Sequence, residues 1–326
     1  MKDQDTLRSA MTATPTISII LPTYNRLEFL PSAIESVFAQ RLTDWELIIA
    51  DDGSEAETRT YLRGLEDPPR VRVLYLSHTG RPAVVRNAAL REAHGEYVAF
   101  LDSDDIWPPM KLEAQIASLR RHPTRKWSYT RFGLVDSAGN PTGSTHPRGG
   151  PAPAGWILEK LLKGKTVVTL SSVVVVRQLL EQLGPFDEQL LMCEDDELYF
   201  RLAAESEIDA IDETLTLKRR HRQHFGDDVT AWRDRRRVFE KMLTSGGNER
   251  FGSLLRRLRG EMAAGLASSQ VSSGKRLSAV GTLVSSAKYS WPYWEWWRSA
   301  ARTLAPPAVR SFVRRQRRSH SGAASL

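Results

Sequence analysis

The first hundred residues alternate between short apolar runs and longer segments with helical periodicity. The runs are mostly β-branched or aromatic, which is typical of strands buried on both faces of a parallel sheet. They cover residues 17–21, 46–50, 71–76 and 97–101. Between them, residues 27–40 place their apolar positions on one helical stripe, and residues 55–65 and 82–94 repeat this more weakly. The alternation predicts an α/β fold with a doubly wound, mostly parallel sheet.

The pattern is less regular after residue 105. Residues 111–121 are predicted to form a helix, and residues 136–153, rich in Gly, Pro, Ser and Thr, a loop. Residues 166–176 are predicted to form a strand. Further helices are expected at 156–162, near 197–204, and in amphipathic pieces from about residue 250.

The composition is that of a soluble globular protein. The chain has 326 residues, of which 41% are hydrophobic and 26% charged, and this excludes wholesale disorder. A single cysteine, Cys193, excludes an internal disulfide and a cysteine-based zinc site. No run of about 18 apolar residues is present, and the N-terminus lacks the apolar segment of a secretion signal. We therefore expect a cytoplasmic protein.

The net charge of +7 is unevenly distributed. Residues 250–326 contain 14 Lys and Arg but 2 acidic residues, a net charge of +12, which leaves −5 for residues 1–249. An acidic body with a basic tail indicates a catalytic domain that contacts an anionic partner, and it makes nucleic-acid binding through the tail a weaker alternative.

Ligands of open α/β sheets bind beyond the carboxyl ends of the strands. The segments that follow the predicted strands, with the helix after the third, supply the candidates for a site that binds a diphosphate ligand and a metal. These are Pro22, Thr23, Asn25, Asp51, Asp52, Arg81, Arg86, Asn87, Asp102 and Ser103. Of these, Arg81 or Arg86 could reach a phosphate.

Asp102 and Asp104 are two positions apart, so in an extended segment both carboxylates point to the same side. Such oxygen donors suit Mg²⁺ or Mn²⁺ bridging to a phosphate. The alternative is a turn, because Asp and Ser favour strand ends by bonding to nearby backbone. A second acidic cluster at residues 194–197 precedes an apolar helix. It either complements the helix dipole or provides a general base across the crevice.

Together these motifs resemble glycosyltransferase family 2. They are residues 17–25 (ISIILPTYN), 51–54 (DDGS), 87–89 (NAA) before 95–105 (GEYVAFLDSDD), and 194–195 (ED), in the family's order over about residues 15–225. The resemblance implies the GT-A fold and an inverting transfer of sugar from a nucleotide-diphosphate sugar, expected to be UDP-linked, to an acceptor hydroxyl. It also implies a setting in bacterial polysaccharide or glycolipid biosynthesis.

The resemblance also implies roles for single residues. Pro22 and Thr23 would line the base and ribose pocket, and Asp52 would contact the base. Asp102 and Asp104 would match the family's D-x-D metal pair, with Asp104 as the direct ligand. Asp195 would be the catalytic base. His224, in an Arg-x-His segment, would touch the metal or diphosphate. Asp196 departs from the family's frequent aromatic residue after the Glu-Asp pair, which points to a different acceptor side.

The resemblance also suggests a division of the chain. We expect a flexible N-terminus (1–14), a catalytic domain (15–240) with a nucleotide-sugar half (15–105) and an acceptor half (106–240), and a helical region (241–326). Residues 289–297 contain four of the nine tryptophans, and arginines follow from 310 to 318. Either this region binds the anionic inner face of the membrane, next to a glycan or lipid-linked acceptor, or its tryptophans pack onto the catalytic domain.

Two other functions stay open at this point. A metal-dependent nucleotidyltransferase would need phosphate-gripping Gly, Arg and Lys after the first strand, where only Arg26 is available. A non-catalytic nucleotide-sugar or glycan-binding protein would be expected to lose Asp104 or Asp195, and both are present.

Overall fold

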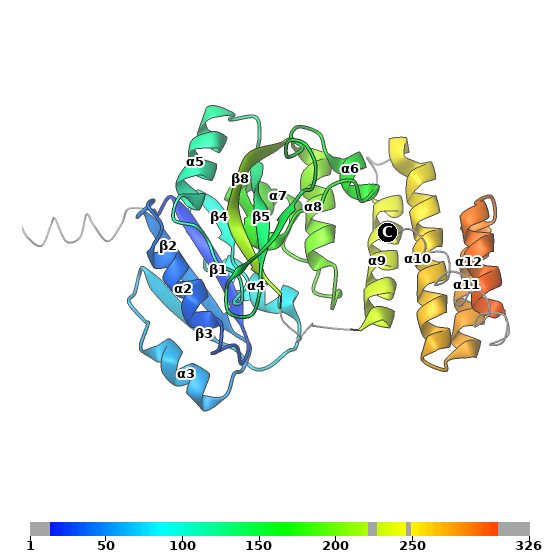
Figure 1. Ribbon diagram of the computed structural model, residues 1–326, viewed down its shortest axis with the longest axis horizontal. Coiled ribbons are helices and arrows are strands. Elements are labelled where there is room, and N and C mark those ends of the chain that lie inside the picture. The colour runs from blue at the N-terminus through cyan, green and yellow to red at the C-terminus, as the bar shows by residue number, and fades with distance from the viewer. Residues whose placement is uncertain (1–13, 221–226, 246–248, 306–326) are drawn as a thin grey trace, which may run out of the picture. The chain divides into compact units, whose positions relative to one another are not determined.

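The computed structural model describes residues 14–220, 227–245 and 249–305. The chain forms two compact units, Met1–His224 and Phe225–Leu326, so the division falls 16 positions before the residue expected from the sequence. Figure 1 shows the α/β elements of the first unit and the helices of the second.

The four predicted N-terminal strands form the parallel half of the sheet. They are β1 (Ile17–Thr23), β2 (Trp45–Asp51), β3 (Val71–Tyr75) and β4 (Tyr97–Phe100). Their spatial order is β3-β2-β1-β4, and every neighbouring pair is parallel. The ladder between β1 and β4 ends at Ile20 and Phe100, so Pro22, which has no N–H to donate, lies beyond it. Because these four strands are parallel, their carboxyl ends lie at the same edge of the sheet.

The other half of the sheet is mixed. β7 (Val173–Val176) is antiparallel to β4 and to β5 (Trp127–Val135), which also pairs with β6 (Pro141–His146) and, in parallel, with β8 (Ile208–Arg219). The described residues thus form one eight-stranded sheet.

Two sequence predictions in this half were partly wrong. The strand predicted at 166–176 is limited to β7, because a 3-10 turn, η1 (Leu170–Ser172), precedes it and the hydroxyl and carbonyl of Ser171 bond to Asp105 and Trp107. The loop predicted at 136–153 contains β6, because Asp136 and Asn140 close a hairpin turn between β5 and β6.

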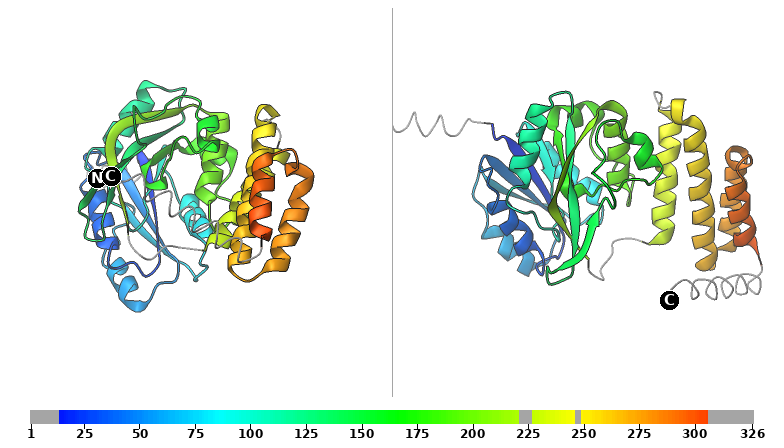
Figure 2. Two further views of the ribbon diagram at one scale, coloured as in Figure 1. Left: turned by 45° about the vertical axis from the view of Figure 1, so that its right-hand side comes forward. Right: turned by 45° about the horizontal axis from the view of Figure 1, so that its top comes forward.

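Helices cover both faces of the parallel half, as predicted. On one face, α2 (Leu30–Phe38), α3 (Ala56–Arg63) and α5 (Lys111–Arg121) enclose a core with the alternate β1 residues Ile17, Ile19 and Leu21. α4 (Pro82–Arg91) contacts β1 and β2 without contributing to that core, as expected for the opposite face (Figures 1 and 2). The remaining helices of this unit are α6 (Leu158–Leu162), α7 (Arg177–Leu183) and α8 (Glu194–Glu205).

Asp209 on β8 ties the strand to α5 and to the segment that follows it. Its buried carboxylate accepts hydrogen bonds from Ser118 and from Arg125, 2.6 Å away, and lies 3.1 Å from His122 Nδ1. Burial opposes the charge, but the hydrogen bonds from Ser118, Arg125 and His122 lower the pKa of Asp209 below its ordinary value. A lowered pKa means that the carboxylate stabilises the fold at neutral pH. This contribution is lost as the pH falls through the lowered pKa.

We therefore expect Asp209→Asn to lower the free energy of unfolding by about 2 kcal/mol at pH 7, because charge-assisted hydrogen bonds are lost. The difference from wild type should shrink in acid. Asp212→Asn, on the same strand but with an exposed side chain paired to Arg131, is the matched control and should have a much smaller effect. Urea unfolding from pH 7 to pH 3 measures both variants, and an equal cost for the two would contradict the role of Asp209.

The second unit is helical. It comprises α9 (Asp228–Thr244), a short 3-10 turn η2 (Glu249–Phe251), α10 (Gly252–Ser272), α11 (Arg276–Ser290) and α12 (Trp294–Leu304). Asp227 caps α9 by accepting hydrogen bonds from the N–H groups of Val229 and Thr230. α10 contacts the other three helices, and small residues with Leu283 and Trp296 form the core. Among the described residues, no helix is long and apolar enough to cross a membrane.

Candidate active site

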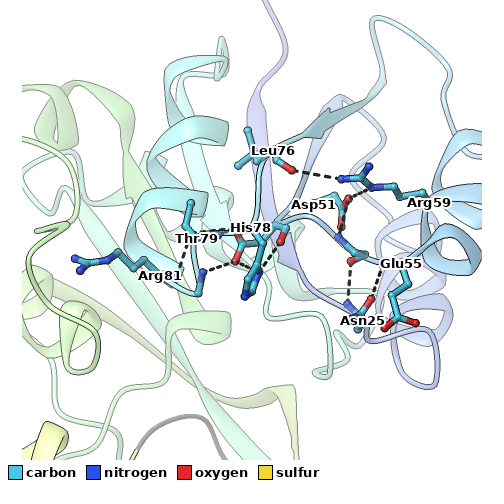
Figure 3. A network of polar contacts seen from close by, with 11 residues as sticks. Asn25, Asp51, Glu55, Arg59, Leu76, His78, Thr79 and Arg81 are labelled. Atoms are coloured by element: carbon cyan, nitrogen blue, oxygen red, sulfur yellow. Dashed lines mark hydrogen bonds and ion pairs between the residues drawn. The ribbon is translucent and has the colours of Figure 1, made fainter.

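The loops after β1 and β2 are joined at the carboxyl edge of the sheet. The N–H of Asp52 donates to the carbonyl of Thr23 at 2.9 Å. Asp51 is fully buried, forms an ion pair with Arg59 at 3.1 Å and accepts a hydrogen bond from the Ser54 N–H. The side chain of Asn25 accepts from the N–H of Glu55 at 2.8 Å (Figure 3). Asn25 and the N–H of Asp52 therefore join the two loops, whereas Asp51 fixes the shape of the second loop.

Asp52 organises the loop after β3. One carboxylate oxygen accepts from the Thr79 N–H and hydroxyl at 2.8 and 2.9 Å, and the other accepts from the Gly80 N–H at 2.9 Å. Gly53 has a φ of +77°, and a Cβ there would lie 2.7 Å from the His78 backbone nitrogen. Only glycine therefore fits between Asp52 and this loop.

An exposed aromatic stack, not predicted from the sequence, lies at the same loops. The rings of Tyr24 and His78 are 4.1 Å apart and nearly parallel. His78 Nδ1 contacts the Asp52 carbonyl at 2.8 Å, which fixes the ring. At the end of β1, the buried hydroxyl of Thr23 has no hydrogen-bond partner within the described part of the chain. Both features lie where the sequence places the nucleotide.

Arg86, buried on α4, connects two acidic motifs that are far apart in the sequence. Its guanidinium donates to Asp102 at 2.8 Å and to Glu194 at 2.6 Å. Burial opposes its charge, but Asp102 and Glu194 raise the pKa of Arg86 above its ordinary value. Burial would raise the pKa of Asp102, but Arg86 holds it below the ordinary value. The guanidinium of Arg86 therefore lies between the carboxylates of Asp102 and Glu194 and bonds to both.

The Asp102–Asp105 segment is a turn in which the carboxylates have different environments. Asp105 is buried and accepts from the Ser171 hydroxyl at 2.6 Å and the Arg219 N–H at 3.0 Å. Burial raises the pKa of Asp105 to about 7, and its neighbours Asp102 and Asp104 add to the shift. Asp102, Ser103 and Asp104 are half-buried. The turn interpretation is therefore confirmed for Asp105, whereas the metal pair Asp102 and Asp104 stays a prediction.

Lys218, near the end of β8, is a cation that sequence reasoning missed. Its ammonium donates to the Thr169 hydroxyl at 3.0 Å. Burial would lower the pKa of Lys218, but Asp105 and Asp102, with smaller effects from Asp195 and Asp104, raise it above the ordinary value. One ammonium is thus within electrostatic reach of carboxylates from both acidic motifs. No local motif marks Lys218, because its neighbours come from other elements.

Arg81 and Asn87 bind the segment before α8. Arg81 donates to the Glu188 carbonyl at 2.9 Å. The buried amide of Asn87 donates to the Phe186 carbonyl and to the Glu188 carboxylate, and accepts from the Phe186 N–H. These contacts hold in place the segment that leads to α8 and its Glu-Asp pair.

Asp195 lies in the first turn of α8. The residue before the helix, Cys193, has a left-handed backbone conformation with a φ of +64°, which turns the chain into α8. Glu194 is buried against Arg86, whereas Asp195 is half-buried and accepts a hydrogen bond from the Asp196 N–H. The Glu-Asp pair thus divides into an anchored and a more accessible carboxylate. His224, the other predicted metal contact, lies outside the described residues.

The carboxylates fit a cation shared with a phosphate ligand. Within the described residues no group of three or more His, Cys, Asp or Glu could hold a metal alone. Mg²⁺ is commonly held by one or two carboxylates and completed by substrate phosphates, and Asp102 with Asp104 offers this donor set.

Comparisons with known proteins agree with this geometry. Residues 18–137 match the family described as Glycosyl transferase family 2. Over 195 residues the chain is 33% identical to WfgD of Escherichia coli, named as a UDP-Glc:alpha-D-GlcNAc-diphosphoundecaprenol beta-1,3-glucosyltransferase, covering 60% of this chain and 72% of WfgD. The chain belongs to glycosyltransferase family 2. These comparisons confirm the family resemblance of the sequence motifs.

Other relatives extend the comparison. TuaG of Bacillus subtilis (strain 168), which its name assigns to teichuronic acid biosynthesis, is 40% identical over 128 residues, covering 39% of this chain and half of TuaG. The structure of S. aureus TarS 1–349 in complex with UDP-GlcNAc matches with a TM-score of 0.62 and 18% identity, over 77% of this chain and 72% of TarS 1–349. The α/β sheet with C-terminal helices therefore has the GT-A fold of the TarS structures.

Proposed function

We propose that this family 2 protein transfers a sugar from a UDP-linked donor to an acceptor hydroxyl with inversion at the anomeric carbon. The observation that carries the proposal is the Arg86 bridge between Asp102 and Glu194. It brings a carboxylate pair suited to a diphosphate-bound cation and a half-buried carboxylate, Asp195, to one site. Single displacement needs a leaving-group side and a base side close together.

The donor nucleotide is assigned to the loops after β1, β2 and β3. Asp52 and Gly53 give these loops a fixed shape, and Tyr24 and His78 offer an exposed ring surface. A base can pack against aromatic rings, and the buried Thr23 hydroxyl would gain a hydrogen bond from a nucleotide. The proposed nucleotide pocket is also shaped by Pro22, Asn25 and Asp51.

The diphosphate is assigned to the Asp102–Asp104 pair and Lys218. Mg²⁺ or Mn²⁺ held by Asp104 and Asp102 would supply Lewis-acid stabilisation of the leaving group. Lys218 adds a fixed positive charge on the protein side, and Arg86 keeps Asp102 ionised and oriented. Asp195 takes the proton from the acceptor hydroxyl as that oxygen attacks the anomeric carbon.

The acceptor is assigned to a lipid-linked glycan in bacterial surface polysaccharide assembly. The names of WfgD and TuaG support this class, since one names a diphosphoundecaprenol-linked acceptor and the other a cell-surface polymer. A lipid-linked acceptor places the enzyme peripherally at the inner face of the membrane.

Donor binding tests the proposal directly. Thermal unfolding should shift upward with the correct UDP-sugar, and more so with Mn²⁺, because a ligand that binds the native state stabilises it. Release of UDP in the presence of a lipid-linked acceptor should follow. Binding without any transfer would favour a binding module, and release of pyrophosphate from a nucleoside triphosphate would favour a nucleotidyltransferase.

Asp104→Asn should remove the Mn²⁺-dependent part of the shift, because the substitution removes the anionic oxygen donor. Glu57→Gln, at an exposed position on α3, is the control and should titrate like wild type. An unchanged Mn²⁺ titration for Asp104→Asn would refute its role as a ligand.

Lys218→Met should weaken UDP binding about tenfold, a loss of about 1.4 kcal/mol, because a half-buried cation near the proposed diphosphate position is removed. Lys165→Met, at an exposed position in the same unit, is the matched control. Isothermal titration with UDP and Mn²⁺ measures both variants, and equal affinities would exclude contact between Lys218 and the diphosphate.

A further inference from the structure

The outer face of α11 carries an exposed apolar stripe. Leu277, Val280 and Val284 are 90%, 43% and 69% exposed, and Trp291, which caps the helix, is 65% exposed. At 100° per residue these positions lie within one 60° sector, over about 21 Å of helix. The opposite face, with Ala279, Leu283 and Ser286, is buried in the core of the helical unit. Among the described residues, the stripe therefore contributes nothing to the core of the helical unit.

α12 extends this surface. Trp294 and Trp297 are 70% and 50% exposed, whereas Trp296 between them is buried and donates to the Ser286 hydroxyl at 3.0 Å. The indole N–H of Trp297 donates to the Trp291 carbonyl at 2.7 Å, so the two surfaces meet at these residues. We call the six residues Leu277, Val280, Val284, Trp291, Trp294 and Trp297 the α11–α12 patch.

The charges around the patch are almost all positive. Residues 273–305 contain five Lys and Arg but one Glu, and the exposed side chains of Lys275, Arg276, Lys288 and Arg298 lie on the same two helices or at their start. Lys288 borders the stripe, about 20° beyond the position of Leu277 at 100° per residue, and lies between Val284 and Trp291 along the helix. A self-complementary dimer would bring these cations toward each other, which disfavours a second copy as the partner.

We propose that the α11–α12 patch docks onto a lipid bilayer whose surface carries anionic headgroups. Tryptophan rings favour the interfacial layer, aliphatic side chains enter the boundary of the acyl chains, and the cations attract anionic lipid. The inference names the surface by which the proposed enzyme would contact the membrane. It rests on the proposed function only for its biological setting. Vesicle binding itself needs neither donor nor acceptor.

Flotation of the full chain with vesicles tests the surface. Wild type should float with vesicles of phosphatidylcholine and phosphatidylglycerol (3:1) and much less with phosphatidylcholine alone. The triple variant Val284→Ser/Trp291→Ser/Trp294→Ser should lose binding at least tenfold, because its buried apolar area falls. Trp297 is kept, since its ring packs edge-on against Trp296. Lys288→Gln/Arg298→Gln should lower the partition to anionic vesicles about thirtyfold.

The control is Trp156→Ser, which removes a tryptophan that is 55% exposed from the other unit and should float like wild type. Unchanged thermal unfolding of all variants shows that they fold. The triple variant should keep its thermal shift with the UDP-sugar, which separates failure of the surface from failure of glycosyl transfer. Equal flotation of wild type and triple variant would overturn the proposal, as would a dimer that the triple variant abolishes while vesicles bind neither protein.

Discussion

Replacing Asp195 by Asn should lower kcat about 10³-fold, because a general base typically contributes 10²–10⁴-fold to rate. The amide keeps the shape of the side chain but cannot accept the acceptor's proton. The Kd for the UDP-sugar should stay nearly unchanged, since Arg86 and Glu194, which join α8 to the Asp102 turn, are untouched. Release of UDP with acceptor present measures kcat, and titration without acceptor measures Kd.

Glu205→Gln is the control for Asp195→Asn, because it removes an exposed carboxylate at the far end of the same helix. It should leave both kcat and Kd at wild-type values. Retained turnover in Asp195→Asn would remove Asp195 as the base. A parallel loss of donor binding and turnover would instead assign Asp195 to the donor side of the site.

The parallel half of the sheet could be predicted because its signal is local. Each of the four strands is a mainly apolar run, and each helix between them carries an apolar stripe. Once these strands are parallel, their carboxyl ends share an edge, so the clusters at Asp51 and Asp102 come together with no further information. The mixed half depends on pairing between β5, β7 and β8, which are distant in sequence, and β5 and β8 lack such runs.

The roles of the individual acidic side chains could not be predicted from the sequence. Asp51 and Asp105 look like their neighbours in the sequence, yet both are buried and bound by protein groups. Their partners Arg59, Ser171 and Arg219 come from a helix, a 3-10 turn and a strand end. The assignment therefore depends on tertiary contacts, and Lys218 was missed for the same reason.

The C-terminal region was predicted as helical from its periodicity, but the burial of its tryptophans was left open. The structure separates them: Trp296 lies in the core, whereas Trp291, Trp294 and Trp297 are exposed. Periodicity can place residues on helix faces. It cannot say which face packs, because α10 supplies that contact from another part of the chain.

Replacing Arg86 by Met should lower the free energy of unfolding by about 3–5 kcal/mol, because it leaves the buried carboxylate of Glu194 and the half-buried carboxylate of Asp102 without their shared cation. Asp102 and Glu194 would each lose a short charge-assisted hydrogen bond. Urea unfolding at pH 7 measures the loss. Since Arg86 links the Asp102 turn to α8, transfer should also fall under conditions where the variant is folded.

A second substitution separates charge from packing. Glu194→Gln in the Arg86→Met background removes one unpaired charge and should restore about 1–2 kcal/mol, whereas in wild type it should destabilise. Arg91→Met, an exposed position on α4, is the control and should change stability by less than about 0.5 kcal/mol. If Arg86→Met is as stable as Arg91→Met, or if Glu194→Gln gives no rescue, the bridge does not hold the two acidic motifs together. The leaving-group and base sides would then need another connection.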